Sequence, residues 1–216
     1  MIKIAPSILA SDFSKVGETV QKLEQSGADY VHCDVMDGSF VPPITFGHQL
    51  VASIRPHTKL PLDCHLMVVH PETHFESFQK AGADIVTIHL EACRSNLKEN
   101  LAKIRSLGMK CGAVLNPDTP IEEIFDFVPL ADMILVMSVF PGYGGQKFIE
   151  ETLPRLEKLR TFCIKNGYPK FDIEVDGGIT ESNVKAVLGA GANVIVAGST
   201  VFKSADMAKT ITVLRG

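Results

Sequence analysis

Short apolar runs alternate along the chain with longer stretches that mix apolar and polar positions. Eight runs are rich in aliphatic or β-branched residues: 2–9 (IKIAPSIL), 29–36 (DYVHCDVM), 60–68 (LPLDCHLMV), 84–90 (DIVTIHL), 110–115 (KCGAVL), 133–139 (MILVMSV), 171–176 (FDIEVD) and 193–198 (NVIVAG). This pattern predicts eight buried strands, with helices in the amphipathic segments between them. Because no hairpin signal separates the strands, we expect them to pair in parallel through helical crossovers.

A weak internal repeat supports this count of strands. The segments SGADYV, AGADIV and AGANVI each place Gly-Ala-Asp or Gly-Ala-Asn just before a predicted strand. Glycine in this position suits the C-terminal end of a helix. Since no linker, low-complexity tract or charge block divides residues 1–216, we expect a single domain. Eight such units in one α/β domain predict a (β/α)8 TIM barrel.

The alternative fold is an open doubly wound sheet, which usually carries a glycine-rich turn after its first strand. The first predicted strand is instead followed by a segment without glycine, SILASDF. Glycines cluster late in the chain, in FPGYGGQKF, VDGGIT and VAGST. In a barrel these segments follow strands six, seven and eight, where phosphate is commonly bound.

Composition narrows the class of protein. The chain is 45% hydrophobic and 21% charged with a net charge of −4, and this balance does not favour nucleic acid as a partner. The apolar run at the N-terminus is short and interrupted by Pro6, so we expect no signal peptide, no membrane partner and a cytoplasmic location. The five cysteines lack a C-x-x-C spacing and lie in apolar runs, which predicts reduced, buried thiols.

Polar residues at the C-terminal ends of barrel strands are the candidates for catalysis. They are Ser7, His32, Asp34, His65, His89, Glu91, Asn116, Ser138 and Asp176. A lone inward histidine is more often a hydrogen-bonded core residue than a ligand. Two histidines and two aspartates at one rim, however, form a nitrogen and oxygen donor set that suits zinc, iron, manganese or cobalt better than magnesium.

A metal beside two carboxylates suits proton abstraction next to a carbonyl, because the metal stabilises the developing enediolate by several kcal/mol. Asp34 and Asp176 would then serve as base and acid. Their strands, two and seven, are separated by strands one and eight, so the two carboxylates can reach opposite faces of a planar intermediate. Removal of a proton on one face and its return on the other inverts a carbon.

The glycine-rich segments and the methionines have further candidate roles. Three glycine runs at consecutive strand ends can wrap an anion with backbone N–H groups, and Ser199 can add a hydroxyl. The segment that begins at Pro141 is long enough for a lid. Met36, Met67 and Met137 fall near strand ends on the predicted inner face, where they either fill the core or line a pocket.

Together these motifs resemble the ribulose-phosphate 3-epimerase family. The resemblance runs in family order over essentially the whole chain, through APSILASDF, VHCDVMDGSFVP, LDCHLMV, VLNPDTP, LVMSVFPGYGGQKF, EVDGGI and VAGSTVF. It implies a metal-dependent TIM-barrel isomerase that interconverts D-ribulose 5-phosphate and D-xylulose 5-phosphate in the pentose phosphate pathway. It also implies one divalent ion per subunit, zinc before iron, manganese or cobalt, and a homo-oligomer, either dimer or hexamer.

The resemblance also implies roles for individual residues. His32, Asp34, His65 and Asp176 would bind the metal, with Asp34 as proton acceptor and Asp176 as proton donor in one direction. The sugar phosphate would contact Ser7, His65, Met36, Met67, Met137, Gly142, Tyr143, Gly144, Gly145, Asp176, Gly177, Gly178, Gly198 and Ser199. Departures from the commonest family wording, at Pro43, His48, Phe140 and Tyr143, fall on none of the implied metal ligands.

Three alternative functions remain open at this point. A 3-epimerase of a six-carbon ketose phosphate, such as D-allulose 6-phosphate, would keep the same metal site. A barrel that decarboxylates or condenses its substrate would carry an Asp-Lys-Asp cluster after the second or third strand, where this chain has histidine and methionine. A sugar-phosphate binding protein without activity would have no need for two carboxylates at one metal.

Overall fold

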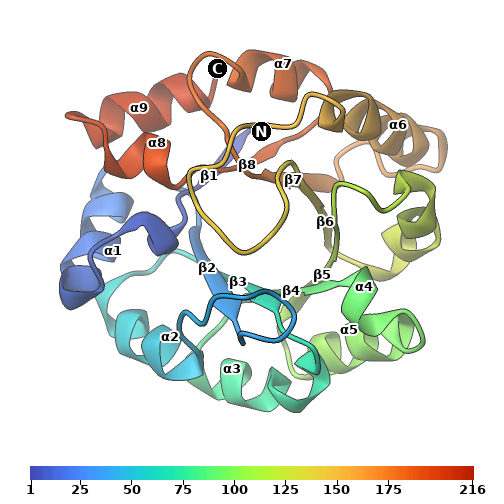
Figure 1. The fold of residues 1–216 in the computed structure, drawn as a ribbon, viewed down its shortest axis with the longest axis horizontal. Coiled ribbons are helices and arrows are strands. Elements are labelled where there is room, and N and C mark those ends of the chain that lie inside the picture. The colour runs from blue at the N-terminus through green and yellow to red at the C-terminus, as the bar shows by residue number, and fades with distance from the viewer.

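Eight parallel strands form the centre of the molecule in a computed structural model that describes residues 1–216 (Figure 1). They are β1 (Lys3–Ala5), β2 (Val31–Met36), β3 (Leu62–Met67), β4 (Ile85–His89), β5 (Lys110–Leu115), β6 (Met133–Met137), β7 (Asp172–Asp176) and β8 (Val194–Val196). Each strand pairs with its neighbour in sequence from β2 to β8, and β8 pairs with β1. The fold is therefore the predicted (β/α)8 TIM barrel.

The helices form an outer ring around the strands (Figure 1). They are α1 (Val16–Gln25), α2 (His48–Ile54), α3 (Phe75–Ala81), α4 (Leu90–Cys93), α5 (Leu97–Ser106), α6 (Thr152–Lys165), α7 (Val184–Gly189), α8 (Ser199–Phe202) and α9 (Met207–Leu214). The crossover from β5 to β6 uses a 3-10 helix, Ile121–Leu130, instead of an α-helix. The main core, a cluster of 52 buried residues, fills the space between strands and helices.

All eight predicted strands are present, but the first is shorter than predicted. The expected strand covered residues 2–9, whereas β1 ends at Ala5. Pro6 has no N–H group for the sheet, and the Ser7 hydroxyl accepts a hydrogen bond from the N–H of Leu9, which starts a 3-10 turn. Ser7 is thereby turned toward the end of the barrel.

The barrel closes between β1 and β2 through few contacts. No ladder joins these strands; a single parallel bridge links Ser7 to His32, and the N–H of His32 donates to the carbonyl of Pro6 at 3.1 Å. This seam lies at the strand ends where the candidate residues gather, so the backbone contact that closes the barrel also places Ser7 beside β2.

Three further features of the structure bear on expectations from the sequence: the glycines of the internal repeat, the cysteines and the character of the helices. Gly27, Gly82 and Gly191 of the internal repeat have φ values of 85°, 87° and 111°, as a helix C-terminus in the left-handed region requires. The five cysteines are free and buried, which confirms the predicted thiols. No helix has the length and apolar character needed to cross a membrane.

Candidate functional site

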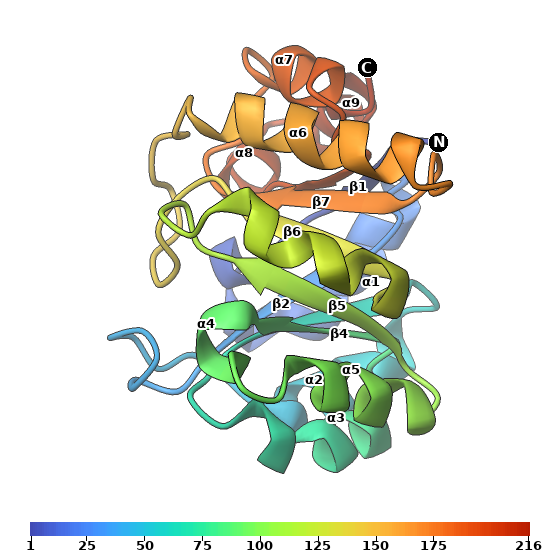
Figure 2. The same cartoon turned by 90° about the vertical axis from the view of Figure 1, so that its right-hand side faces the viewer.

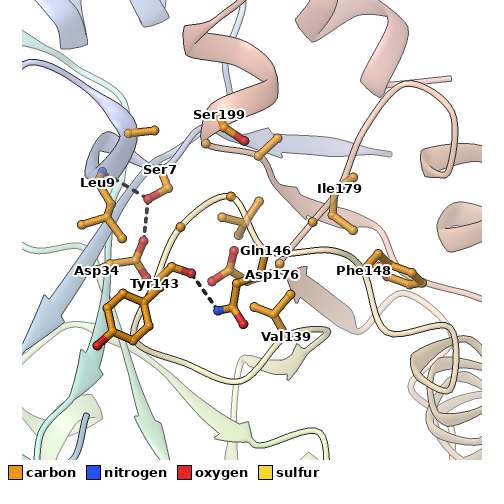
Figure 3. Close-up of a pocket in the computed structure, with 18 of the residues that line it drawn as sticks. Ser7, Leu9, Asp34, Val139, Tyr143, Gln146, Phe148, Asp176, Ile179 and Ser199 are labelled. Carbon is orange, nitrogen blue, oxygen red and sulfur yellow. Dashed lines mark hydrogen bonds between the residues drawn. The ribbon is translucent and has the colours of Figure 1, made fainter. Parts of the chain in front are cut away.

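A cavity of about 790 Å³ opens at the C-terminal ends of the strands. The loops that follow β2 and β6 project on this side of the barrel (Figure 2). Its lining comes from β1, β2, β3, β6, β7 and β8 and the segments that follow them. In Figure 3, Asp34 lies beside Ser7, and Asp176 comes from the other side of the pocket, near Gln146. Volumes of this size accommodate small-molecule ligands.

Four predicted residues converge at the floor of the cavity. His32, Asp34, His65 and Asp176 each offer one ligand atom, and these atoms lie within 4.8 Å of one another. The register of β2 and β3 sets Asp34 opposite His65, and Oδ1 of Asp34 is 3.2 Å from Nδ1 of His65 and 3.3 Å from Nε2 of His32. The two histidines are fully buried, Asp34 is 4% exposed and Asp176 is partly exposed.

The two aspartates differ in their electrostatic environment. Burial would raise the pKa of Asp34, but the charge of His32 and hydrogen bonds from His32 and His65 hold this pKa below its usual range. Burial and the negative charge of Asp34 raise the pKa of Asp176 to about 7. One carboxyl group is therefore held ionised, while the other binds a proton near neutral pH.

The histidines also differ from each other. Burial lowers the pKa of His32, but the charges of Asp34 and Asp63 outweigh it and raise this pKa well above its usual range. Burial lowers the pKa of His65 to about 4, and its hydrogen bond to Asp34 offsets this only in part. His65 therefore presents a neutral imidazole to the cluster.

A second group of polar side chains lies beneath the first. Nδ1 of His32 is 2.7 Å from Oδ2 of Asp63 and 3.7 Å from Oε1 of Glu174, and all three side chains are fully buried. Alternation along the strands predicts that Asp63 and Glu174 face inward, but gives no partner for either. The contact needs the register of β2 against β3, which sets His32 opposite Asp63.

The four converging residues fit a divalent metal ion. Nε2 of His32 is buried without a hydrogen-bond partner, although it points toward the carboxylate of Asp34. A buried nitrogen without a partner is costly, and a metal ion that replaced the proton of this nitrogen would supply the missing partner. Two imidazole nitrogens and two carboxylate oxygens are a donor set for zinc, iron, manganese or cobalt.

The predicted anion-binding residues gather at the other end of the same cavity. Gly142, Tyr143, Gly144, Gly145, Gly177, Gly178, Gly198 and Ser199 all line it. The backbone N–H groups of Gly177, Gly178 and Gly198 donate no hydrogen bond within the chain. Gly178, in the turn after β7, has a φ of 66°. A Cβ atom there would lie 2.4 Å from the backbone nitrogen of Phe148, so the close approach of the loop after β6 requires glycine at position 178.

Ser7 and the three methionines also lie in the cavity wall. The Ser7 hydroxyl donates to Oδ2 of Asp34 at 2.5 Å. Met36, Met67 and Met137 are almost fully buried, yet each contributes to the lining. They also belong to small buried apolar clusters, so both positions that the sequence left open for them apply.

Other strand-end residues support the site without lining the cavity. The Ser138 hydroxyl contacts the carbonyl oxygens of Asp176 and Gly177 at 2.8 and 2.7 Å, which holds the turn after β7. His89, Glu91 and Asn116 form a polar network at the ends of β4 and β5, in which Nδ1 of His89 lies 3.1 Å from Glu91 and the N–H of Asn116 donates to Glu91.

Sequence reasoning missed several polar contributors to the cavity, among them Thr45 and Lys203. The Thr45 hydroxyl donates to the carbonyl of Asp34 at 2.7 Å and accepts from the N–H of Met36, so it holds the end of β2 in place. Lys203 lines the cavity four residues after Ser199, on the side of the glycine segments. The sequence signal that could have indicated Lys203 is its position one helical turn after Ser199 of the VAGST segment.

The fold and the site together define the class. A closed parallel barrel with convergent carboxylates and histidines at the C-terminal ends of its strands has the architecture of TIM-barrel enzymes, whose active sites lie at this face. Residues 3–202 match the model of a protein family described as "Ribulose-phosphate 3 epimerase family", and the chain belongs to this family. The protein is accordingly an enzyme and an isomerase.

Individual relatives agree with this assignment. The chain is 51% identical to a ribulose-phosphate 3-epimerase of Synechocystis, over 99% of this chain and 93% of that protein. It is 45% identical to a ribulose-phosphate 3-epimerase of Bacillus subtilis, over 100% and 99%. A solved 3-hexulose-6-phosphate synthase superposes with a TM-score of 0.70 at 19% identity, covering 100% of this chain and 98% of that one. That likeness shows the shared barrel fold alone.

Proposed function

We propose that this isomerase interconverts D-ribulose 5-phosphate and D-xylulose 5-phosphate and depends on a divalent metal ion. One of the two carboxylates, Asp34 or Asp176, removes the proton at C3 and the other returns a proton to the opposite face. The observation that carries the proposal is the convergence of these two carboxylates, from β2 and β7, with His32 and His65 on one point of the cavity floor. The substrate follows from the names of the relatives in Synechocystis and Bacillus subtilis.

The chain's own residues would bind and orient the sugar. A metal ion held by His32, Asp34, His65 and Asp176 would polarise the ketose carbonyl and stabilise the negative charge of an enediolate. Ser7 positions the carboxylate of Asp34 through its hydrogen bond and lies where a sugar hydroxyl can reach it. The unpaired N–H groups of Gly177, Gly178 and Gly198, with Ser199, are suited to the phosphate.

Proton transfer follows from the different environments of the two aspartates. Asp34, held ionised, accepts the C3 proton from one face of the sugar. Asp176, which comes from the other side of the pocket, donates a proton to the other face. Met36, Met67 and Met137 border the cavity with apolar surface, which limits water around the planar enediolate. The reverse reaction exchanges the roles of the two carboxylates.

The test is the fate of the C3 hydrogen in deuterium oxide, followed by NMR with D-ribulose 5-phosphate. The wild-type protein is expected to give C3-deuterated xylulose 5-phosphate. Asp34→Asn should give neither exchange nor product, whereas Asp176→Asn should lose epimerisation and keep slow exchange through Asp34. The exposed Asp118→Asn is the matched control. A wild-type rate in Asp34→Asn would contradict the assignment.

The metal and the substrate need separate tests. We propose zinc as the ion, with iron, manganese or cobalt as alternatives, because the two imidazole donors favour these metals over magnesium. Activity lost on chelation and restored by one of these ions supports metal dependence. The alternative substrate, D-allulose 6-phosphate, is tested in the same assay, and a higher kcat/KM for it would replace the pentose phosphate.

We further propose that the chain forms a homo-oligomer, a dimer or a hexamer, as the resemblance to the family implies. The measurement is the molar mass in solution by light scattering, compared with the 23.5 kDa of one chain. A mass of one chain across the micromolar range would contradict this proposal.

A further inference from the structure

His65 is in contact with a second buried histidine on the side away from Asp34. Its Nε2 lies 2.8 Å from Nε2 of His89, and the two ring planes are inclined by 26° with centroids 5.0 Å apart, so the rings meet edge to edge. Both side chains are fully buried. A hydrogen bond between two imidazole nitrogens needs one N–H donor and one lone-pair acceptor, so the proton positions of the two rings depend on each other.

Glu91 determines the direction of this hydrogen bond. Its Oε2 lies 3.1 Å from Nδ1 of His89, and its Oε1 accepts from the N–H of Asn116 at 2.8 Å and from the Thr119 hydroxyl. Hydrogen bonds from His89, Thr119 and Asn116 outweigh burial and lower the pKa of Glu91 to about 2, so it is an ionised acceptor. The proton of His89 therefore sits on Nδ1, and its Nε2 is an acceptor for Nε2–H of His65. A neutral His65 has one ring proton, so this bond excludes donation from its Nδ1 to Oδ1 of Asp34, 3.2 Å away, the position that an ion would take.

We propose that His89 and Glu91 are positioning residues that keep the proton of His65 on Nε2 and leave Nδ1 free to bind the divalent ion. The inference rests on the proposed metal site. It explains why His65, unlike His32, has no carboxylate of its own behind it: Asp63 contacts His32 directly, whereas Glu91 acts on His65 through an intervening imidazole.

The rest of the fold holds this relay in place. Arg155 of α6 donates to the carbonyl oxygens of Asn116 and Thr119 at 2.7 and 3.0 Å, so the segment that supplies two donors to Glu91 is fixed. Phe40, in the loop after β2, packs on the ring of His89 with centroids 4.7 Å apart. The relay is therefore rigid and closed to solvent at His89.

Glu91→Gln is the informative variant because it keeps the shape and removes one acceptor. If the amide oxygen stays with Asn116 and Thr119, the amide NH2 group faces Nδ1 of His89. His89 then carries its proton on Nε2 and donates to His65, which must hold its own proton on Nδ1. That proton occupies the metal-binding position, so zinc binding must reverse the whole relay.

The test measures tautomers and zinc affinity, not turnover. In metal-free wild-type protein, long-range ¹H–¹⁵N NMR is expected to show the His65 proton on Nε2. Metal-free Glu91→Gln should show it on Nδ1, and chelator competition should give a zinc affinity lower by about 10- to 100-fold, the range typical of lost support behind a ligand. His89→Phe, which keeps a ring but removes the acceptor, should weaken zinc binding similarly.

The chain supplies a matched control in a second His-X-Glu pair. Nδ1 of His70 lies 3.5 Å from Glu72 on the exposed surface, and Glu72→Gln should leave zinc affinity unchanged. Affinities of Glu91→Gln and His89→Phe within twofold of wild type would overturn the inference, provided that His65→Ala weakens binding. If His65→Ala binds zinc as the wild type does, the result contradicts the proposed metal site and therefore this inference as well.

Discussion

At the scale of single residues, different surroundings give the chemically identical side chains of Asp34 and Asp176 different pKa values. Asp34 has the positive charge of His32 nearby and a hydrogen bond from Ser7, whereas at Asp176 burial and repulsion from Asp34 outweigh the attraction of His32. Two carboxyl groups with pKa values driven apart are a common basis for acid and base roles. Sequence alone predicts the pair but not which member is raised, because that depends on hydrogen-bond partners from other strands.

The raised pKa of Asp176 predicts a pH dependence of stability in the metal-free protein. Its folded pKa, about 7, exceeds the usual value of 3.8, so the folded state holds a proton that the unfolded state has lost between these values. Its contribution to the free energy of unfolding is therefore present at low pH and decreases as the pH rises toward 7. The lowered pKa of Asp34 acts only at lower pH, whereas the pKa of His65, lowered to about 4, acts in the same window and in the opposite direction to that of Asp176.

Urea unfolding of chelator-treated protein at pH 5 and pH 6.5 measures this effect. We expect the rise in pH to stabilise Asp176→Asn more, or destabilise it less, than the wild type, because asparagine does not titrate. An equal pH dependence in the two proteins would mean that Asp176 does not retain its proton in the folded state.

At the scale of elements, polar residues at the starts of strands hold neighbouring strands in register. The side chain of Asp84, before β4, accepts from the N–H of Leu62 in β3 at 2.8 Å. Asn193, before β8, accepts from Ile173 in β7 at 2.7 Å. The internal repeat indicates these positions by sequence, but their partners become visible only once the order of the strands is known. The repeat is therefore a structural feature of the sheet and not only a helix-ending signal.

Removal of one of these contacts is expected to lower stability and leave the site intact. Asp84→Ala leaves the N–H of Leu62 without its acceptor and Arg55 without its ion pair at 2.8 Å. The loss in the free energy of unfolding should be about 1–3 kcal/mol, mostly from the unpaired N–H, because partly exposed ion pairs contribute little.

The measurement for this variant is urea unfolding beside the assay of turnover. The exposed Asp126→Ala, which makes no side-chain hydrogen bond, is the control and should stay within about 0.5 kcal/mol of wild type. An unchanged free energy of unfolding in Asp84→Ala would show that water replaces the carboxylate at the start of β3.

At the scale of the whole molecule, the sequence predicts the barrel fold better than the side-chain contacts inside it. The eight runs and their helices specify the fold, and the C-terminal strand ends specify where His32, Asp34, His65 and Asp176 meet. The contacts behind these residues, such as that of Asp63 with His32, depend on side-chain register between strands, which periodicity does not give. The early end of β1 was also missed, because the apolar run continues through Ile8 into a 3-10 turn.

The metal site joins parts of the barrel that the backbone joins weakly. Its ligands come from β2, β3 and β7, on both sides of the seam where one bridge links Ser7 to His32. An ion that binds only the folded chain stabilises it by RT ln(1 + [ion]/Kd), about 2.7 kcal/mol at a concentration of 100 Kd. We therefore expect a bound divalent ion to stabilise the entire molecule and not only the cavity floor.

The choice of ion matters for this last prediction, because unfolding exposes five buried thiols. Zinc binds thiolates, so its affinity for the unfolded chain reduces the gain, whereas manganese prefers oxygen ligands and gives the cleaner comparison. Manganese should raise the free energy of unfolding of the wild type with saturating dependence on concentration, and should have little effect on Asp34→Asn. An equal gain in both proteins would place the stabilising ion somewhere other than the four converging residues.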